Sequence, residues 1–406
     1  MEKARECFFM RPTGLLTQDD GLFMKRAFLF CPENDIALGR GCARFTPPRQ
    51  AALLACYGAP LMWWLGDESD YVVVPEVVDE EYSLSLAEWE RDVTLRIGAG
   101  PRVVTSLAGL DVGTLCPWGW SGYTANKWRD AGVNETVLDR NLPDLEKVRM
   151  LSHRRSATVI NHLLAGLIDW GNFGQSAPAG AAEAATIGEV ERYMQCNNRF
   201  YAKSPWSSSG RGVVCSDGVS PARMLERCAA VIREQGSVML EPFYDKVLDF
   251  AMLFECNPDG NVCFHGYSQF YNARSTAYTG NLLVPDSEII RNVATYIDIS
   301  LLGEVRRSLE SVLTGMLEGA YRGFLGVDMM VARASGGTFF LIPCVELNLR
   351  MTMGVVARAV SWRIPVDKGF MQINPGRPDG CPDSLDDNVV QLVPTNRYFN
   401  IQAVEG

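Results

Sequence analysis

A chain of 406 residues is long enough for two or three domains around a large buried core. Hydrophobic residues make up 47% of it and charged residues 21%, as in ordinary globular enzymes. The net charge of −10 and the lack of basic runs argue against a nucleic-acid-binding surface, so any site for an anion must be a local group of cations.

The twelve cysteines stand singly, without a C-x-x-C spacing, and there are only three histidines. This usage fits a reducing cytoplasm and argues against a zinc site or a disulfide framework. Residues 1–24 lack the apolar core and cleavage site of a signal peptide, so we expect a flexible tail or an upstream start there. No apolar run reaches the roughly 20 residues that span a bilayer. We therefore expect a cytoplasmic protein.

Strands that alternate with helices over residues 25–142 predict an open α/β domain with functional loops at its strand ends. The expected strands are Lys25–Phe30, Tyr71–Val74 and Arg102–Thr105, and the expected helices are Arg49–Trp63 and a segment ending at Trp128. Glu33, Asn34 and Asp35 follow the first strand, where they either contact a ligand or form a capping and turn cluster.

A helix is predicted to begin after Asp144, which is a suitable N-cap, and its helical spacing continues to Leu164. Three of its cations, Lys147, Arg149 and Arg154, either reach a ligand or belong to a solvated helix face.

A loop of small residues follows a β-prone run that ends in Lys203, and a second strand follows the loop. Its residues are Ser207, Ser208, Ser209, Gly210, Arg211 and Gly212. The glycines and serines let the backbone approach a ligand and turn N–H groups towards anionic oxygens, while Lys203 and Arg211 add cations. The loop is not a P-loop, because no Gly-Lys-Ser/Thr follows it. Taken alone, these residues also fit a polar hairpin turn on the surface.

Residues 199–241 predict a small α/β unit, with a helix at Ser220–Glu234 and a strand at Val238–Glu241. Paired strands are expected beyond it, at Val247–Cys256 and Asn261–Phe270. A polar loop then holds Arg274 and a predicted tight turn at Gly280-Asn281. This loop either contacts an acceptor or phosphate group or is a plain surface loop.

An apolar strand at Phe324–Ala332 carries one carboxylate, Asp328, and a turn at Gly337 leads into the returning strand. Alternation places Glu346, Asn348 and Arg350 on one face of the returning strand, with Glu346 roughly opposite Asp328. Two carboxylates and an amide oxygen form a hard site of the kind that Mg²⁺ takes. The alternative is a structural network between the carboxylates and Arg350.

A helix is expected after Met351, with Gly354 near its start and Arg358 one turn further, an arrangement that suits an anionic group. Residues 376–406 contain β-prone runs, to which we assign no function.

The order of these parts resembles the ATP-grasp superfamily of ligases over about residues 144–360. The resemblance rests on Lys203 with the loop 207–212, on Val238–Phe243, on Asp328 and on Glu346–Arg350. Together these motifs are typical of the superfamily but not of any one member.

The resemblance implies an α/β (α+β) ATP-grasp fold with a pre-ATP-grasp domain at 25–142 and an ATP-grasp domain at 143–375. Within the latter it implies a small lid at about 199–241 and a larger C-terminal subdomain, followed by an extension at 376–406. Such a first domain often helps to bind the acceptor substrate.

The resemblance also implies roles for individual residues. ATP would contact Lys147, Lys203, Ser207, Ser208, Ser209, Gly210, Arg211, Gly212, Glu241, Pro242 and Phe243. Asp328, Glu346 and Asn348 would hold Mg²⁺, or Mn²⁺ in its place. Arg350 and Arg211 would be catalytic, facing the transferring phosphoryl group, and Arg274, Gly354 and Arg358 are candidates for substrate binding.

The implied activity is that of an ADP-forming ligase, which activates a carboxylate as an acyl phosphate for attack by an amine or similar nucleophile. We expect small-molecule substrates, no nucleic-acid or membrane partner, and an assembly compatible with a homodimer. The alternatives are a kinase-like phosphotransferase on the same scaffold and a nucleotide-binding regulator without turnover.

Overall fold

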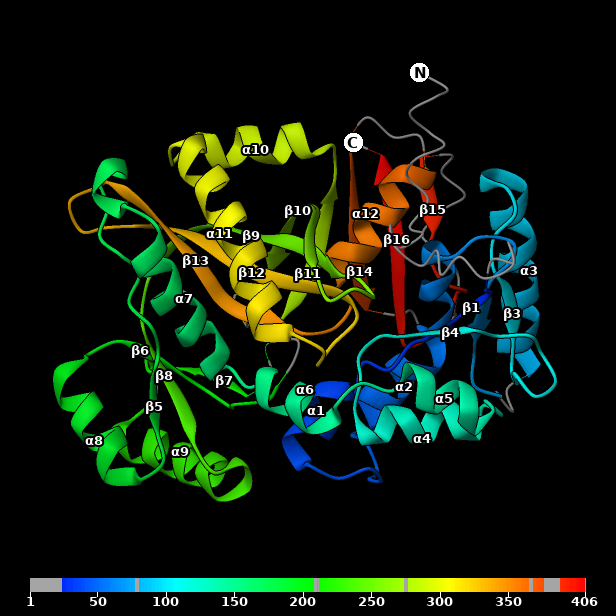
Figure 1. The fold of residues 1–406 in the computed structure, drawn as a ribbon, viewed down its shortest axis with the longest axis horizontal. Coiled ribbons are helices and arrows are strands. Elements are labelled where there is room, and N and C mark those ends of the chain that lie inside the picture. Colours follow the sequence, from blue (N-terminus) through cyan, green and yellow to red (C-terminus); the bar gives the residue numbers. More distant parts are fainter. Residues whose placement is uncertain are drawn as a thin grey trace.

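The computed structural model of the chain describes residues 24–76, 80–207, 210, 212–273, 277–364, 368–375 and 388–405. Its strands form three sheets, of four, eight and four strands (Figure 1). The first sheet is parallel, and the other two are built from antiparallel pairs. The predicted α/β fold class is therefore confirmed.

The N-terminal domain contains the parallel sheet, in the order β3-β2-β1-β4. Its strands are β1 (Arg26–Leu29), β2 (Tyr71–Val73), β3 (Arg102–Val104) and β4 (Thr114–Pro117). Its helices are α1 (Asn34–Arg40), α2 (Arg49–Tyr57), the 3-10 helix η2 (Ala59–Leu65), α3 (Glu80–Ile97), α4 (Gly122–Asp130) and α5 (Glu135–Asn141). The single helix predicted for Arg49–Trp63 is wrong in its second half, because the chain tightens into η2 after Gly58, with Pro60 near its start.

The long helix predicted from Asp144 is interrupted. Asp144 caps α6 (Leu145–Leu151) as expected, and α7 (Arg155–Leu167) begins only after a break at residues 152–154. At the break, the backbone N–H of Arg154 donates to the carbonyl of Pro205, 3.1 Å away. This bond ties the start of α7 to the loop that the sequence predicts to bind a nucleotide.

The small sheet has the order β5-β8-β6-β7 and, with two helices, contains the segment predicted to be a lid. Its elements are β5 (Ala182–Ala184), α8 (Ile187–Cys196), β6 (Phe200–Lys203), β7 (Val213–Cys215), α9 (Pro221–Gln235) and β8 (Val238–Pro242). A separate apolar cluster, which includes Val190, Phe200, Met224 and Leu240, holds the helices against the sheet. Since β5 and α8 belong to this unit, it begins earlier than residue 199. The short 3-10 helix η3 (Trp170–Phe173) precedes it.

The large sheet has the order β13-β12-β9-β10-β11-β14-β16-β15. Its strands are β9 (Asp245–Cys256), β10 (Val262–Asn272), β11 (Tyr278–Leu283), β12 (Gly323–Arg333), β13 (Phe339–Asn348), β14 (Gly369–Pro375), β15 (Val389–Gln391) and β16 (Phe399–Glu405). The accompanying helices are α10 (Asp286–Ala294), α11 (Ile299–Leu317) and α12 (Met353–Arg363). The C-terminal extension thus completes this sheet, because β16 pairs with β14.

The tight turn predicted at Gly280-Asn281 is wrong, because both residues lie inside β11. Gly280 pairs with Tyr271 on one side and with Gln372 on the other. A Cβ at this glycine would lie 2.2 Å from the carbonyl oxygen of Met371. Gly280 is therefore required for close strand packing and not for a turn.

Alternating residues of β9 enter two different cores. Phe250, Met252 and Phe254 join the core that contains α7 and α11, whereas Ala251 and Leu253 join the core that contains α12. The α12 core also includes residues of β1, η2 and the C-terminal strands, so the N-terminal domain and the large sheet share one apolar interior.

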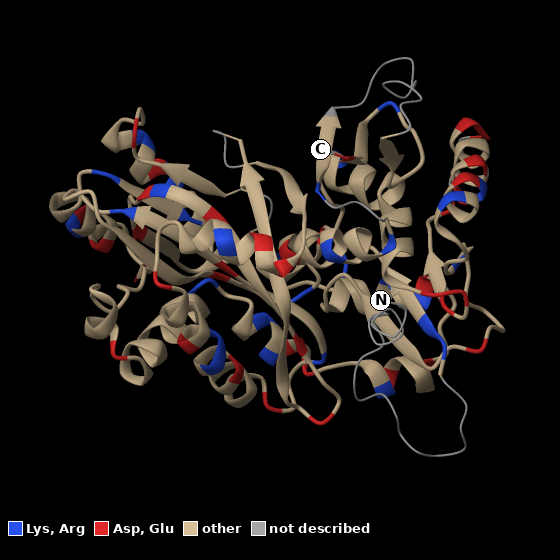
Figure 2. Cartoon of the chain, turned by 90° about the horizontal axis from the view of Figure 1, so that it is seen from above, with Lys and Arg blue, Asp and Glu red and all other residues tan. Residues whose placement is uncertain are grey.

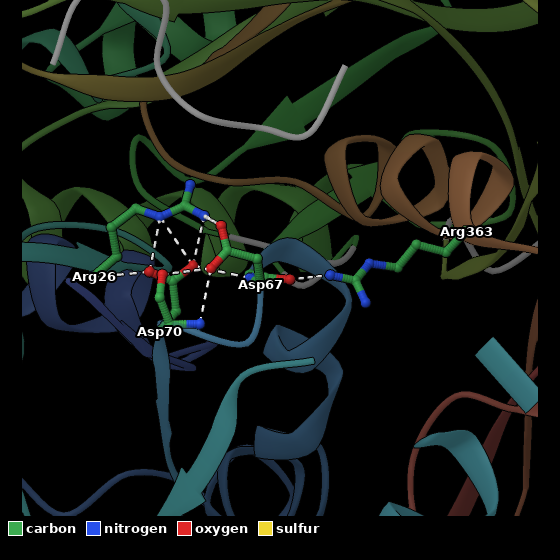
Figure 3. Close-up of polar contacts among 6 residues, drawn as sticks. Arg26, Asp67, Asp70 and Arg363 are labelled. Carbon is green, nitrogen blue, oxygen red and sulfur yellow. Dashed lines mark hydrogen bonds and ion pairs between the residues drawn. The ribbon is translucent and has the colours of Figure 1, made fainter. Parts of the chain in front are cut away.

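A group of charged residues reinforces this shared interior. Arg26 of β1 pairs with Asp70, and its Nε lies 3.2 and 3.1 Å from the two carboxylate oxygens. Figure 3 shows Arg363 of α12 pointing towards Asp67, and its guanidinium donates to the carbonyl of Gly66. These contacts hold α12, and the end of β13 that precedes it, against the N-terminal domain.

Acidic and basic residues are interspersed over the chain and do not form one basic face (Figure 2). This agrees with the expectation that an anion site must be built locally. Within the described residues, no helix is both long enough and apolar enough to cross a membrane.

Candidate active site

The β12–β13 hairpin brings the predicted metal ligands together. Asp328 pairs directly with Glu346, as the sequence predicts, and Gly326 pairs with Asn348 on the same face. Burial and the Glu346 carboxylate raise the pKa of Asp328 above its usual range, although a hydrogen bond from Asn348 opposes the rise. Two facing carboxylates in a partly buried position repel each other, so this site favours a bound cation.

The donor set fits Mg²⁺ as a partial site. Among the described residues, no three or more His, Cys, Asp or Glu side chains gather to form a complete metal cage. Mg²⁺ in nucleotide enzymes usually takes one or two carboxylates and completes its shell with water and phosphate oxygens. Asp328, Glu346 and the amide oxygen of Asn348 supply that number of protein ligands.

Arg350 stands two residues beyond Asn348, at the junction with the N-terminal domain. Its Nε donates to Asp35 Oδ2 of α1 over 2.8 Å, and its Nη1 donates to the carbonyl of Met351 over 3.1 Å. The Met351 N–H in turn donates to the carbonyl of Trp118, just after β4. The N-terminal domain therefore orients the guanidinium that the resemblance places at the reacting phosphoryl group.

The side chain of Arg154 connects the loop before Gly212 to Glu346, one of the predicted metal ligands. Its side chain is 6% exposed, and its Nη1 donates to Glu346 Oε2 over 2.7 Å. Its Nε donates to the carbonyl of Ser204 over 3.0 Å, and its Nη2 reaches Ser207 Oγ at 3.2 Å. Of the three cations that the sequence left open, Arg154 is thus the one that contacts a predicted site residue.

The predicted nucleotide loop is described only in part, because Ser208, Ser209 and Arg211 lie outside the described residues. Gly210 and Gly212 have φ angles of 72° and 71°, in the region that favours glycine. A Cβ at Gly212 would lie 2.6 Å from Ser204 Oγ. The Ser204 N–H donates to the carbonyl of Gly212 over 2.8 Å and so closes the base of the loop.

Lys203 and Glu241 form an ion pair on the lid sheet, with side chains that are 10% and 14% exposed. Lys203 pairs across the ladder with Met239, which puts Glu241 at the diagonal position on the same face. Tyr201 and Phe243 stack nearby, with ring centroids 5.8 Å apart. Lys203 and Glu241, both predicted to contact ATP, therefore contact each other on one face of the small sheet.

A small pocket opens beside Glu241, between the small sheet and the large sheet. Its walls combine apolar side chains with a few polar groups. The apolar residues include Pro242, Ala157, Met330, Ile342 and Cys344. The Asn161 amide of α7 donates to the carbonyl of Cys344 over 2.8 Å. A flat heteroaromatic ring suits such walls.

A second small pocket lies next along β13 and is polar. Asp35, Ser207, Glu346, Asn348 and Arg350 line it, so three parts of the fold meet there: α1, the predicted nucleotide loop and β13. Successive parts of β13 thus line the two pockets, with Ile342 and Cys344 in the first and Glu346 in the second.

Other predicted site residues lie apart from these pockets. Lys147 is exposed on α6, and its Nζ lies 4.0 Å from Asp144. Arg358 pairs with Asp286 at the start of α10. Gly354 is buried in α12, where an added Cβ would lie 2.5 Å from Ser268 Oγ. Arg274 lies outside the described residues. The predicted roles of these four residues stay predictions.

We predict that Arg154→Lys weakens Mg-ATP binding by about 5- to 30-fold. The lysine keeps the charge but loses the forked contacts to Glu346, Ser204 and Ser207 that only a guanidinium makes. Losing about two such bonds corresponds to about 1–2 kcal/mol. Calorimetric titration with Mg-ATP measures the change.

Arg155→Lys is the matched control, because Arg155 is adjacent, 55% exposed and paired with Glu183 on the surface. This control should bind Mg-ATP like the unaltered protein. Equal affinities for the two variants would contradict a role for Arg154 in the site.

Comparison with solved structures finds similar folds at low sequence identity. An N5-carboxyaminoimidazole synthetase from Staphylococcus aureus, solved with ADP, is 10% identical, with a TM-score of 0.49 over 96% of this chain and 95% of that chain. A biotin carboxylase from Campylobacter jejuni is 13% identical, with a TM-score of 0.46 over 95% of this chain and 88% of that chain.

A carboxyaminoimidazole ribonucleotide synthase from Aspergillus clavatus, solved with ATP, is 12% identical, with a TM-score of 0.46 over 94% of each chain. No protein-family model matches the sequence, and no curated protein matches it either. The similarity is therefore one of overall fold alone.

Proposed function

We propose that this chain is an ATP-grasp ligase that uses Mg-ATP to activate a carboxylate as an acyl phosphate, which an amine then attacks. The observation that carries the proposal is the group formed by Asp328, Glu346, Asn348 and Arg350 along one strand end. Glu346, Asn348 and Arg350 line a polar pocket, and Asp328 faces Glu346 from β12. The preceding part of β13 lines the apolar pocket at Glu241.

The two pockets mark the proposed positions of the two ends of a nucleoside triphosphate. The apolar pocket between the lid and the large sheet suits the adenine, with Glu241 and Lys203 at its edge. The triphosphate would follow β13 towards Glu346, where Arg154 and the loop that ends at Gly212 supply cationic and N–H donors. Ser208, Ser209 and Arg211, predicted for this role, are part of the same proposal.

Asp328, Glu346 and Asn348 would hold Mg²⁺ against the phosphates. The bound ion would supply neutralisation of the charge on the phosphate oxygens. Glu346 is suited to this task because Arg154 occupies only its Oε2, and its Oε1 makes no hydrogen bond to a described residue. Arg350 would stabilise the negative charge on the transferring phosphoryl group.

The reaction needs no nucleophilic side chain. The substrate carboxylate attacks the γ-phosphorus, so the chain needs to align the reactants and compensate their charges. We also propose a cytoplasmic location, because all ten described cysteines are free. We keep the proposed domain limits of 25–142 and 143–375 and add the strands of 376–406 to the second domain, since β16 pairs with β14.

The test is a screen for phosphate release. Purified protein with Mg-ATP is offered a mixture of small carboxylic acids, with and without a mixture of primary amines that includes the twenty L-amino acids. The proposal predicts release of ADP and phosphate that requires both mixtures. A phosphorylated product that accumulates unchanged would instead indicate a kinase, and nucleotide binding without turnover would indicate a regulator.

A further inference from the structure

Asp35 lies where an open parallel sheet usually binds its ligand. From β1 the chain proceeds to β2 and β3 on one side, whereas β4 lies on the other side of β1. The strand order therefore reverses between β1 and β4, and ligands of such sheets bind at the carboxyl ends of the strands at this reversal. Asp35 follows β1, and Trp118 and Gly119 follow β4.

Asp35 also lines the polar pocket, facing the β13 residues from the other domain. Its Oδ2 accepts the bond from Arg350 Nε, whereas its Oδ1 makes no hydrogen bond to any described residue. The Asp35 side chain is 14% exposed, so Oδ1 is accessible to a small molecule in the pocket. This oxygen provides a free anionic acceptor beside the proposed phosphoryl site.

The residues before Asp35 are also incompletely bonded. Glu33 and Asn34 are each 1% exposed, yet Glu33 Oε2 and Asn34 Nδ2 have no hydrogen-bond partner among the described residues. A buried polar atom without a partner costs about 1–3 kcal/mol. A Cβ at Gly119 would lie 2.6 Å from Asn34 Nδ2 and 3.0 Å from Arg350 Cβ, so the Asn34 amide lies close to the stem of Arg350.

The negative charge of the buried Glu33 carboxylate is already compensated. Lys127 Nζ lies 3.0 Å from Glu33 Oε1, and Tyr123 donates to the same oxygen over 3.2 Å. A cationic ligand in the polar pocket would meet Asp35, which lines the pocket, and not Glu33, which does not.

We propose that the nucleophile of the reaction is a primary amine bound as an ammonium by Asp35, and that Asp35 Oδ1 takes the proton that this amine must lose. The inference rests on the proposed function and specifies that its amine is a primary amine, bound as an ammonium. It also adds Asp35, from the N-terminal domain, to the groups that touch the reacting atoms.

The step balances as follows. The ammonium gives one proton to Asp35 Oδ1, and the nitrogen lone pair forms a bond to the carbonyl carbon of the acyl phosphate. The bond between that carbon and the phosphate oxygen breaks, and phosphate leaves with the electron pair. The nitrogen gives its second proton to the leaving phosphate as the amide forms, and Asp35 returns its proton to water.

The experiment compares two nucleophiles in the Asp35→Asn variant. Each reaction contains Mg-ATP and the mixture of carboxylic acids, with either the mixture of primary amines or hydroxylamine. Hydroxylamine is mostly uncharged at neutral pH and attacks acyl phosphates directly, so it needs neither ammonium binding nor a base. Amides and hydroxamates are measured by mass spectrometry, and folding is checked by thermal unfolding.

The proposal predicts that Asp35→Asn lowers amide formation at least about tenfold more than it lowers hydroxamate formation, because hydroxamate formation loses only the contact between Asp35 and Arg350. Asp35→Glu, which keeps a carboxylate, should recover part of the amide formation. Asp130→Asn, at an exposed position of α4 in the same domain, should change neither reaction.

Three results would overturn the inference. An equal loss with both nucleophiles means that Asp35 acts only by holding Arg350. Amide formation that stays unchanged in Asp35→Asn means that the amine binds elsewhere. If the unaltered protein forms hydroxamate but no amide, the acyl phosphate is supported and an amine substrate is excluded. If the unaltered protein forms neither product, the proposed function itself fails.

Discussion

Glu346→Gln and Asp328→Asn should each lower Mg-dependent turnover on the order of 1000-fold or more while leaving the fold intact. Each substitution removes one of the two anionic ligands that we propose for Mg²⁺, whose third protein ligand would be a neutral amide. Phosphoryl transfer depends mainly on charge compensation and alignment, so loss of a ligand acts directly on the transition state. The measurement is the rate of ADP formation at saturating Mg-ATP.

The fold should survive because neither substitution changes the side-chain volume much. Asp328→Asn also removes the repulsion between two facing carboxylates, so its thermal stability should equal or exceed that of the unaltered protein. Glu304→Gln is the matched control, because Glu304 lies on the surface of α11 and pairs only with Arg307. Turnover near the original rate in either site variant would remove the basis for the metal assignment.

Lys203→Ala should weaken ATP binding by roughly 30- to 1000-fold. Removing a charge that contacts phosphate in a partly desolvated site costs on the order of 2–4 kcal/mol. The structure adds a second effect, because the variant leaves Glu241 without its cation in a position only 14% exposed. An uncompensated carboxylate there repels the nucleotide phosphates and lowers the free energy of unfolding.

Lys246→Ala is the control for this variant. Lys246 is also ion-paired, with Asp249 three residues along β9, but its side chain is 44% exposed. Because the lysine is exposed and Asp249 also accepts a hydrogen bond from Asn272, loss of this pair costs well under about 1 kcal/mol. Calorimetry should therefore find nearly unchanged ATP affinity in Lys246→Ala, and equally small effects from both lysines would leave Lys203 without its proposed role.

The β12–β13 hairpin was predictable because its register follows from local rules. The turn at Gly337, where φ is 85°, fixes where the chain reverses, and strict alternation then sets which side chains face each other. Asp328 and Glu346 meet for this reason. The Lys203–Glu241 pair was not predicted, because it depends on how β6 and β8 pair after the helix α9 between them.

The break between α6 and α7 could not be predicted from helical spacing, since residues 152–154 contain neither glycine nor proline. What interrupts the helix is a tertiary contact, the bond from Arg154 to Pro205 some fifty residues later. The pairing of Arg350 with Asp35 is similarly long-range, with 315 positions between them. Sequence reasoning marked both residues, but only the fold brings them together.

The most direct test of the proposed chemistry follows one oxygen atom. The carboxylic acid that the screen identifies is labelled with ¹⁸O in its carboxyl group and incubated with the protein, Mg-ATP and the amine. If an acyl phosphate forms, a carboxyl oxygen becomes the bridging atom and leaves with the phosphate, so the released phosphate carries one ¹⁸O. Unlabelled phosphate, or release of AMP and pyrophosphate in place of ADP, would contradict the account.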